Sequence, residues 1–353
     1  MGKQPYQLNQ KAREIRPYTP DLPEGGDWIH LDANESFLQP PEDAWGEMLG
    51  ALAELPLNRY PDPAAGAVCR AFGEHYGVDP ALVTAGNGSD ELISVLFTAF
   101  LEKGDVFATA EPDFSMYAFY GQLCEGRHLP IEKKNFRLDV DNVIETCENE
   151  GVKLLIFSNP CNPTSLGLVK AEVIRLIQGV SGLVVLDEAY MDFWSESLLA
   201  QVSSFDNLVI LRTCSKALGG AGLRLGFAAA NPRLTEVIRG AKSPYNVNGL
   251  TQALGKALLT YPAQGALETL RTAKETLEAG LLALATGGAF RVLRGQTNFV
   301  SLAMPHPRDF YEALRREKIL VRLTGGLIRI TAGTAEENQA VLAAARRYFC
   351  GAV

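Results

Sequence analysis

The sequence predicts an α/β protein: a large domain with a mainly parallel, helix-flanked sheet, followed by a smaller C-terminal α+β domain. Three observations lead to this prediction. Between about residues 80 and 230, short apolar runs alternate with longer amphipathic ones. After residue 247 long helical segments precede short strands, and the first 40 residues are rich in proline and glycine. We therefore expect an N-terminal arm over 1–39, a large domain over 40–247 and a small domain over 248–353.

The composition, with 47% hydrophobic and 21% charged residues, is ordinary for a soluble globular protein. A net charge of −8 and the lack of a dense Lys/Arg run argue against nucleic-acid binding. No apolar run approaches the ~20 residues of a membrane helix, and the N-terminus lacks a signal-peptide core, so we expect a cytoplasmic protein. Six scattered cysteines and four separate histidines predict reduced thiols and no metal site.

Four apolar runs in the large domain predict strands: DVFATA (105–110), VKLLIFS (152–158), GLVVLDE (182–188) and NLVILRT (207–213). Their apolar residues run continuously instead of alternating, which is typical of strands buried on both faces. Amphipathic stretches at 89–104 and 170–180 predict helices. Strand–helix alternation of this kind favours a mainly parallel sheet with helices on both of its faces.

The small domain begins with two helical segments over 248–286, broken at TYPAQG. Three strand-like stretches follow, FRVLRG, TNFVSLAM and ILVRLTGGLIRITAG, and they predict a smaller sheet. Two amphipathic stretches, HPRDFYEALRREK and EENQAVLAAARRYF, predict the helices that cover it.

Polar side chains follow three of the predicted strands of the large domain. In an open parallel sheet the carboxyl ends of the strands line the ligand site, so these side chains should converge. A buried aspartate is costly without a positive partner. Taken alone, Asp187 fits the cap of a helix equally well. Together, an amide, a carboxylate, a phenol and an amine indicate a site. The residues are Asn159, Asn162, Asp187, Tyr190, Thr213, Ser215 and Lys216.

The stretch TAGNGSDELI predicts an anion site. Its glycines precede a helix whose first turn holds Ser89 and Asp90, and free backbone N–H groups at such an end bind phosphate. An ordinary turn with a helix cap explains the stretch as well. Together with Thr213, Ser215 and Arg224, this helix N-terminus would form a phosphate-binding site.

These motifs, in this order, resemble the fold-type-I pyridoxal-phosphate (PLP) aminotransferases of class I and II. The resemblance covers nearly the whole chain and implies PLP as cofactor. It makes Lys216 the Schiff-base lysine and pairs Asp187 with the protonated pyridine nitrogen. The remaining implied contacts are the ring oxygen with Tyr190 and Asn162, the ring face with Phe114, and the phosphate with Ser89, Asp90, Thr213, Ser215 and Arg224.

The implied chemistry suits these residue types. A lysine near a positive ring and an arginine loses its proton more readily, so Lys216 would act as nucleophile and then as base. Asp187 would keep the ring nitrogen protonated, so that the ring accepts electrons when the substrate Cα loses a proton.

Four further motifs, IRPYTP, LDANES, NRYPDP and GNGSDE, are similar to the histidinol-phosphate aminotransferase family. That resemblance implies amino transfer from L-histidinol phosphate to 2-oxoglutarate, a step of histidine biosynthesis, giving imidazole acetol phosphate and L-glutamate. It implies a homodimer in which Tyr60 reaches the cofactor phosphate of the neighbouring subunit; taken alone, Tyr60 fits a buried aromatic beside a turn equally well. Tyr18 and Asn34 would lie near substrate; a packed arm tyrosine and a turn asparagine are the alternatives.

The chain departs from the family's pattern in two places. The family's N-E-N-P is NESFLQPP here, and its N-P-T-G is NPTS, where we expect Ser165 still to form the turn. Aromatic aminotransferases remain an alternative, as does threonine-phosphate decarboxylase, although that enzyme typically has Gly-Glu-Thr-Glu where this chain has GSDE. A nucleotide-binding oxidoreductase would need G-x-G-x-x-G spacing, which the stretch GNGSDE lacks. A non-catalytic binding module would be expected to lose Lys216.

The stretch ILVRLTGGLIRITAG contains two arginines near a predicted turn. By resemblance Arg329 binds the substrate carboxylate or its equivalent end. If Gly325 and Gly326 form a two-residue hairpin loop, Arg322 faces Arg329. Opposed like charges repel, so we interpret the pair as a clamp for a doubly anionic substrate, such as an amino phosphate or glutamate. The alternative is that Arg322 turns to water.

Overall fold

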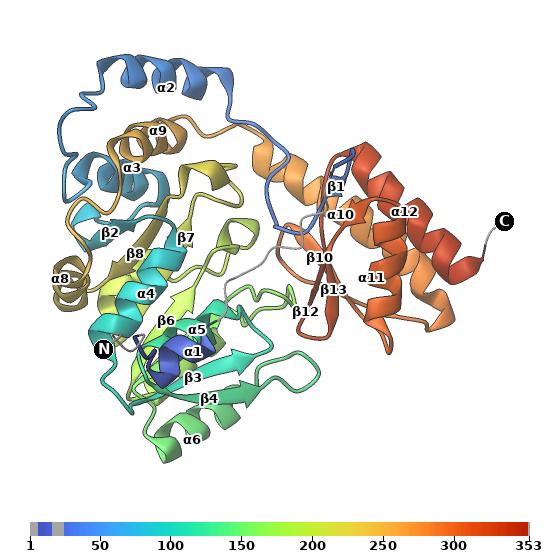
Figure 1. The fold of residues 1–353 in the computed structure, drawn as a ribbon, viewed down its shortest axis with the longest axis horizontal. Helices are drawn as coiled ribbons and strands as arrows, with labels where there is room; N and C mark the ends of the chain where they lie inside the picture. Colours follow the sequence, from blue (N-terminus) through green and yellow to red (C-terminus); the bar gives the residue numbers. More distant parts are fainter. Residues whose placement is uncertain (1–5, 16–24, 352–353) are drawn as a thin grey trace, which may run out of the picture.

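The computed structural model describes residues 6–15 and 25–351 of the chain. Within them, seven strands form the central sheet in the order β2-β8-β7-β6-β5-β3-β4 (Figure 1). Their bounds are β2 (Val83–Gly86), β8 (Gly226–Ala230), β7 (Leu208–Thr213), β6 (Leu183–Asp187), β5 (Leu154–Ser158), β3 (Val106–Glu111) and β4 (Arg127–Glu132). Every pair from β7 to β4 is parallel, whereas β8 runs antiparallel to both of its neighbours.

Helices cover both faces of this sheet, as the sequence predicts. One apolar core joins the sheet to α3 (Gly66–Tyr76), α6 (Val140–Glu150) and α7 (Lys170–Gly179). A second core, on the other face, joins it to α4 (Ser89–Phe100), α5 (Met116–Leu123) and α8 (Pro232–Ala241). Strands β5, β6 and β7 are buried at every position, which explains their unbroken apolar sequences.

The small domain is built on an antiparallel sheet with the strand order β12-β13-β10-β9. Its strands are β9 (Arg291–Leu293), β10 (Phe299–Ala303), β12 (Arg322–Thr324) and β13 (Leu327–Thr331). The helices α10 (Ala266–Leu284), α11 (Pro307–Arg316) and α12 (Ala335–Cys350) pack on it around a third apolar core, drawn in orange and red in Figure 1.

The hairpin between β12 and β13 has the predicted register. Gly325 and Gly326 form its loop with φ angles of 56° and 73°, and Arg322 is the partner of Arg329. The positive φ angles that the two-residue loop requires are readily adopted only by residues such as glycine.

Two segments pack across the domain boundaries expected from the sequence. Strand β1 (Ile29–His30) pairs in parallel with β11 (Ile319–Leu320), and Leu31 enters the small-domain core. Helix α9 (Gly249–Thr260) packs instead against α3 and α2 (Glu42–Glu54) of the large domain. An apolar helix face shows that a helix is covered, but not which neighbour covers it, so sequence periodicity does not place α9.

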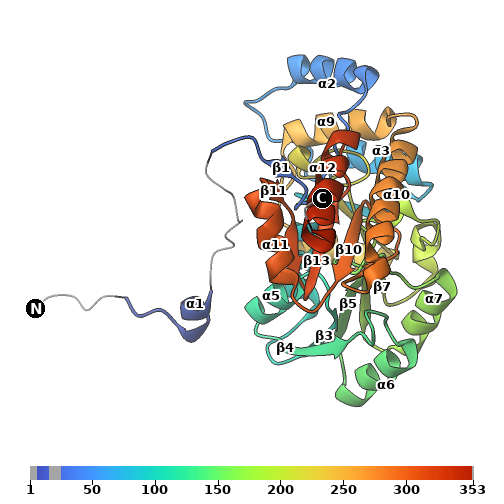
Figure 2. The ribbon, with the colours of Figure 1, turned by 90° about the vertical axis from the view of Figure 1, so that its right-hand side faces the viewer.

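Two helices, α2 and α1 (Gln10–Glu14), lie at the periphery of the molecule. Helix α2 lies at the edge of the large domain, beyond α9, in both views (Figure 1 and Figure 2). Near the N-terminus, α1 is attached through Lys11, whose Nζ donates to the carbonyl oxygen of Leu123 over 3.1 Å. In the described part of the chain, none of the helices combines the length and apolar character required to cross a membrane.

Candidate active site

The carboxyl ends of β5 and β6 lie side by side in the central sheet. Ser158 is the register partner of Asp187, and the Asn159 N–H donates to the Asp187 carbonyl oxygen over 2.9 Å. Strand β7 pairs with β6 and ends at Thr213, three residues before Lys216. The parallel order therefore brings the three predicted strand ends to one edge of the sheet.

Lys216 is half-buried, and its Nζ donates a 2.8 Å hydrogen bond to the Ala33 carbonyl oxygen. Burial lowers the pKa of the amine to about 8, and the positive charge of Arg329 adds to this effect. Near neutral pH a larger share of the amine is therefore neutral than for an ordinary lysine. A neutral amine is the nucleophilic form.

Asp187 is buried and accepts hydrogen bonds from the Tyr117 hydroxyl over 2.7 Å and from the Ala189 N–H over 3.0 Å. Burial raises the pKa of its carboxyl to about 6, although the Tyr117 bond favours the ionised form. A cation placed beside this carboxylate would be strongly stabilised. Sequence analysis missed Tyr117; the signal is EPDFSMY, where it stands one helical turn after Phe114.

Side chains from three parts of the chain meet near Tyr190. The Asn34 amide donates to the Tyr190 hydroxyl over 2.7 Å, and Arg329 donates to Asn162 Oδ1 over 2.6 Å. Arg329 also donates to the carbonyl oxygen of Asp32. Burial raises the pKa of Tyr190 to about 12, so its hydroxyl stays protonated near neutral pH. The structure thus brings together four residues that the sequence places up to 295 positions apart: Asn34, Asn162, Tyr190 and Arg329.

The N-terminus of α4 faces Arg224. A Cβ added at Gly88, which has a φ of 83°, would lie 2.9 Å from Arg224 Nη2. A Cβ at Gly226 would lie 2.2 Å from the Ser89 backbone nitrogen, so only glycine permits this approach. Nearby, Thr213 Oγ1 donates to Ser215 Oγ over 3.0 Å. A guanidinium, a helix N-terminus and two hydroxyls form the donor set that a phosphate needs.

The remaining predicted residues differ in their surroundings. Phe114 packs edge-on against Tyr117, with ring centroids 5.5 Å apart, and so lies near Asp187. Tyr60 is 81% exposed and stacks on Tyr245 at 4.6 Å. Arg322 is half-buried opposite Arg329 in the hairpin, and Tyr18 lies outside the described residues.

Comparison with known proteins identifies the family. Residues 26–345 match the family described as aminotransferase class I and II. The chain belongs to this family. It is 38% identical over 343 residues to a histidinol-phosphate aminotransferase of Clostridium kluyveri, covering 95% of this chain and 96% of the relative. It is 36% identical over 337 residues to the enzyme of that name from Clostridium novyi, covering 94% of each.

Solved structures confirm the fold of this aminotransferase. The histidinol-phosphate aminotransferase of Sinorhizobium meliloti, solved in complex with pyridoxal-5'-phosphate, has a TM-score of 0.87 over 98% of both chains, at 21% identity. An aspartate aminotransferase of Thermotoga maritima has a TM-score of 0.82, at 19% identity, over 97% of this chain and 99% of its own. Both likenesses show a shared architecture.

The departure at NPTS keeps the expected turn in this aminotransferase. Ser165 is fully buried with a φ of 64°, in the left-handed region that favours glycine. Its hydroxyl lies 2.7 Å from Thr297 Oγ1, and its carbonyl oxygen accepts from the Gln296 N–H over 2.9 Å. The substituted turn is thereby joined to the segment that leads into β10.

A buried charge cluster behind β6 and β7 was not predicted. Arg212 contacts Asp192 over 2.8 Å and Glu188 over 3.4 Å, and its guanidinium lies 4.4 Å from the centre of the Tyr76 ring. Glu188 and Arg212 adjoin Asp187 and Thr213 in the sequence but point to the opposite face. Alternation along a strand is the signal that could have suggested them.

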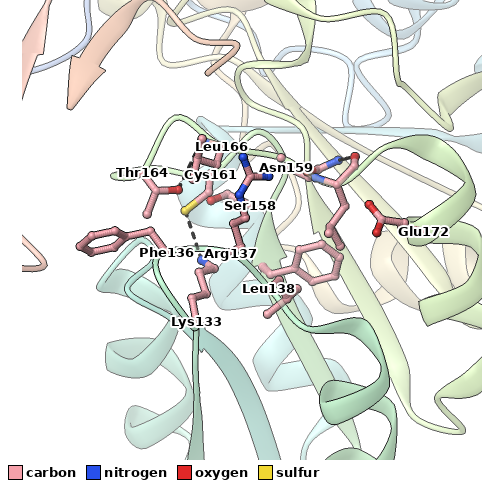
Figure 3. Close-up of a pocket in the computed structure, with 13 residues that line it drawn as sticks. Lys133, Phe136, Arg137, Leu138, Ser158, Asn159, Cys161, Thr164, Leu166 and Glu172 are labelled. Carbon is pink, nitrogen blue, oxygen red and sulfur yellow. Dashed lines mark hydrogen bonds between the residues drawn. The ribbon is translucent and has the colours of Figure 1, made fainter. Parts of the chain in front are cut away.

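A cavity of about 130 Å³ lies beside the loop that follows β5. Figure 3 shows Lys133, Arg137 and Glu172 around it, with Ser158 and Asn159 on the loop side. Among the described residues, its lining includes neither Lys216 nor Asp187. The cavity therefore shares Asn159 with the predicted site residues but lies to one side of Lys216 and Asp187.

Proposed function

We propose that the chain is a PLP-dependent histidinol-phosphate aminotransferase, which transfers the amino group of L-histidinol phosphate to 2-oxoglutarate. Relatives of that name match it at 36–38% identity over at least 94% of its length. The observation that carries the proposal is that Lys216 and Asp187 lie together with a phosphate-binding cradle, formed where the N-terminus of α4 faces Arg224.

The residues present fit PLP at each of its functional groups. Lys216 would bond the aldehyde carbon, and Asp187 would pair with the ring nitrogen, which explains a buried carboxylate with a raised pKa. Tyr190 and Asn162 would meet the ring oxygen, and Phe114 would stack on the ring. The phosphate would be held by the cradle, which comprises Ser89, Asp90, Thr213, Ser215 and Arg224.

Bound PLP supplies an acceptor for the electrons left when the substrate Cα loses a proton. In this proposal the Lys216 amine would take that proton from Cα and would later give it up again, acting as base and then as acid. The lowered pKa suits this work, because a general base is most effective when its pKa lies near the working pH. The hydrogen bonds from Tyr117 and the Ala189 N–H fix the orientation of the Asp187 carboxylate, so its negative charge would stay beside the ring nitrogen.

The substrate end of the site is proposed to be the arginine pair in the β12–β13 hairpin. Arg322 and Arg329 are direct register partners, so their side chains leave the sheet on the same face. Two like charges in this arrangement favour an anion between them. L-Histidinol phosphate carries a phosphate and L-glutamate two carboxylates, so both amino compounds of the proposed reaction suit such a pair.

The proposed active unit is a homodimer. Helix α2 and the segment after it expose several large apolar side chains, Trp45, Leu49, Leu52 and Leu57, next to the exposed Tyr60. An apolar surface of this kind is typical of a protein–protein interface. Tyr60 would reach the cofactor phosphate of the partner subunit across it.

A substrate panel tests the proposal. The purified protein should absorb near the visible edge with PLP bound, and borohydride should attach the cofactor to Lys216. With 2-oxoglutarate as acceptor, L-histidinol phosphate should be used with a higher kcat/KM than phenylalanine or tyrosine. Preference for the aromatic amino acids, or release of CO₂ from threonine phosphate, would contradict the proposed substrate.

A further inference from the structure

A buried ion pair lies behind the residues that are proposed to contact the cofactor. Lys133, directly after β4, contacts Asp113, two residues after β3, with 3.0 Å between Nζ and Oδ2. Their side chains are 4% and 0% exposed. We propose that this pair is a positioning element, which holds Phe114 and Asn162 in place for the cofactor. The proposal rests on the proposed function, because it concerns how that site is ordered.

The Asp113 carboxylate joins two segments that are proposed to contact the cofactor, one through Phe114 and one through Asn162. Its Oδ1 accepts from the Phe114 N–H over 2.9 Å and from the Ser158 hydroxyl. Its Oδ2 accepts from the Ser158 N–H over 3.1 Å. One carboxylate thus ties the residue expected to stack on the ring to the end of β5.

The connection continues from Ser158 to the substrate end of the site. The Asn162 N–H donates to Ser158 Oγ over 3.0 Å, and Asn162 Oδ1 accepts from Arg329. A continuous series of hydrogen bonds therefore runs from Lys133 through Asp113, Ser158 and Asn162 to Arg329. Lys133 contacts none of the predicted cofactor residues in this series directly, so its effect on them is indirect.

Lys133 also fixes the backbone on which Asp113 stands. Its ammonium donates to the carbonyl oxygens of Ala110 and Pro112 over 2.9 and 2.8 Å and lies 3.2 Å from Cys161 Sγ. Figure 3 shows the contact with Cys161 at the wall of the cavity. Removing the ammonium would leave the buried carboxylate without a compensating charge, and the carboxylate would then give up its present geometry or its charge.

The experiment compares three variants with the parent. Lys133→Met removes the charge, whereas Ser158→Ala removes the hydroxyl that donates to Asp113 and accepts from Asn162, and it leaves Lys133 and Asp113 unchanged. Lys134→Met is the matched control, because Lys134 is the next residue and its side chain is 73% exposed beside Asp139. Amide hydrogen exchange of residues 158–166 is measured on the apoenzymes, and PLP affinity and the visible circular dichroism of bound PLP on the loaded ones.

We expect exchange of 158–166 to be at least about tenfold faster in Lys133→Met and about fivefold faster in Ser158→Ala, with Lys134→Met within twofold of the parent. The PLP dissociation constant should rise at least about fivefold in both test variants, and the dichroism per bound PLP should fall by about half. A merely structural pair would lower the melting temperature and leave the dichroism per bound PLP unchanged.

Two results would overturn the proposal: parental loop exchange in Ser158→Ala or in a folded Lys133→Met, or parental dichroism per bound PLP in either variant. If Lys133→Met does not fold, Ser158→Ala decides the matter by itself. If the parent fails to bind PLP, the proposed function is wrong. Loop exchange in the apoenzymes still decides whether the pair orders this segment.

Discussion

The Nζ atom of Lys216 donates a 2.8 Å hydrogen bond to the carbonyl oxygen of Ala33, a residue 183 positions earlier in the chain. Ala33 follows β1, which pairs with β11 beside the small domain. The amine at the end of β7 is therefore held by the segment that joins the small-domain core. A carbonyl oxygen accepts from a neutral amine as well as from an ammonium, so the bond is compatible with the lowered pKa of Lys216.

Lys216→Ala should abolish transamination while PLP still binds non-covalently in its cradle. Losing the nucleophile and the proton carrier together should lower kcat by several orders of magnitude. Steady-state assays and borohydride trapping measure this, with Lys153→Ala as control, because Lys153 is exposed at the opposite end of β5. Near-parental turnover without added amine would contradict the assignment.

The rate at which PLP combines covalently with the apoenzyme should rise with pH up to about 8 and then level off. The neutral amine is the reacting form, and its pKa is lowered from 10.5 to about 8. Stopped-flow absorbance between pH 6 and pH 9.5 measures this rate, and non-covalent binding to Lys216→Ala corrects for ionisation of PLP itself. A rate still rising tenfold per pH unit above pH 9 would show an unperturbed lysine.

Asp187→Asn should fold and bind PLP but transaminate at least about a hundredfold more slowly, because the ring nitrogen loses its charge partner. The variant keeps an oxygen that accepts from Tyr117, so its structure should be preserved. Activity within a few-fold of the parent would show that the carboxylate is not needed as an electrostatic partner.

The apoenzyme offers a second test of Asp187. The pKa of Asp187 in the folded state, about 6, lies above its ordinary value of 3.8, so the folded state binds more protons between these pH values. Stability therefore falls as pH rises through this window, by at most about 3 kcal/mol. Asp187→Asn lacks this loss, so its stability relative to the parent should increase between pH 4 and pH 7 in denaturant titrations. An unchanged difference would contradict the raised pKa.

Tyr60→Phe should weaken cofactor retention more than folding. It removes one hydrogen bond to a charged acceptor, which contributes about 1.5–3 kcal/mol. If Tyr60 acts across the interface, mixing this variant with Lys216→Ala subunits should form hybrid dimers with one intact site. Activity of the mixture should then exceed that of either variant alone. Hybrid dimers without any recovery would place Tyr60 outside the partner's site.

Arg329→Ala and Arg322→Ala should differ in their effects on substrate selection. Arg329→Ala should raise KM for every amino donor, because it also releases Asn162. Arg322→Ala should raise KM for histidinol phosphate and glutamate more than for amino acids with neutral side chains. Steady-state kinetics on both groups of substrates measures this. Equal losses across the two groups in the Arg322 variant would reject the clamp and favour an aromatic donor.

Local sequence patterns predicted some features at the level of single residues. Gly325 and Gly326 specify a two-residue loop, and the loop alone determines that Arg322 pairs with Arg329. The unbroken apolar runs of β5, β6 and β7 likewise predict buried parallel strands, and so the edge at which Asp187 and Lys216 meet.

Other features had no local signal. Strand β8, with the sequence GFAAA, lacks the β-branched residues that indicate strands, and it is buried and antiparallel because β7 and β2 flank it. Lys133 belongs to a polar stretch after an edge strand, and its sequence resembles that of a solvated loop. Only the folded chain shows that Asp113 lies beside it.

The sequence by itself therefore determined strands β5, β6 and β7, the groups at their carboxyl ends and the hairpin loop, because periodicity, turn residues and residue type act over a few neighbouring positions. The tertiary structure alone decided the partners of those groups. Packing brings together segments that are distant in the sequence, and three contacts of the site depend on it. These contacts are Tyr117 with Asp187, Ala33 with Lys216, and Lys133 with Asp113. Their energies depend on burial and on charges that are distant in the chain, and no local pattern records either quantity.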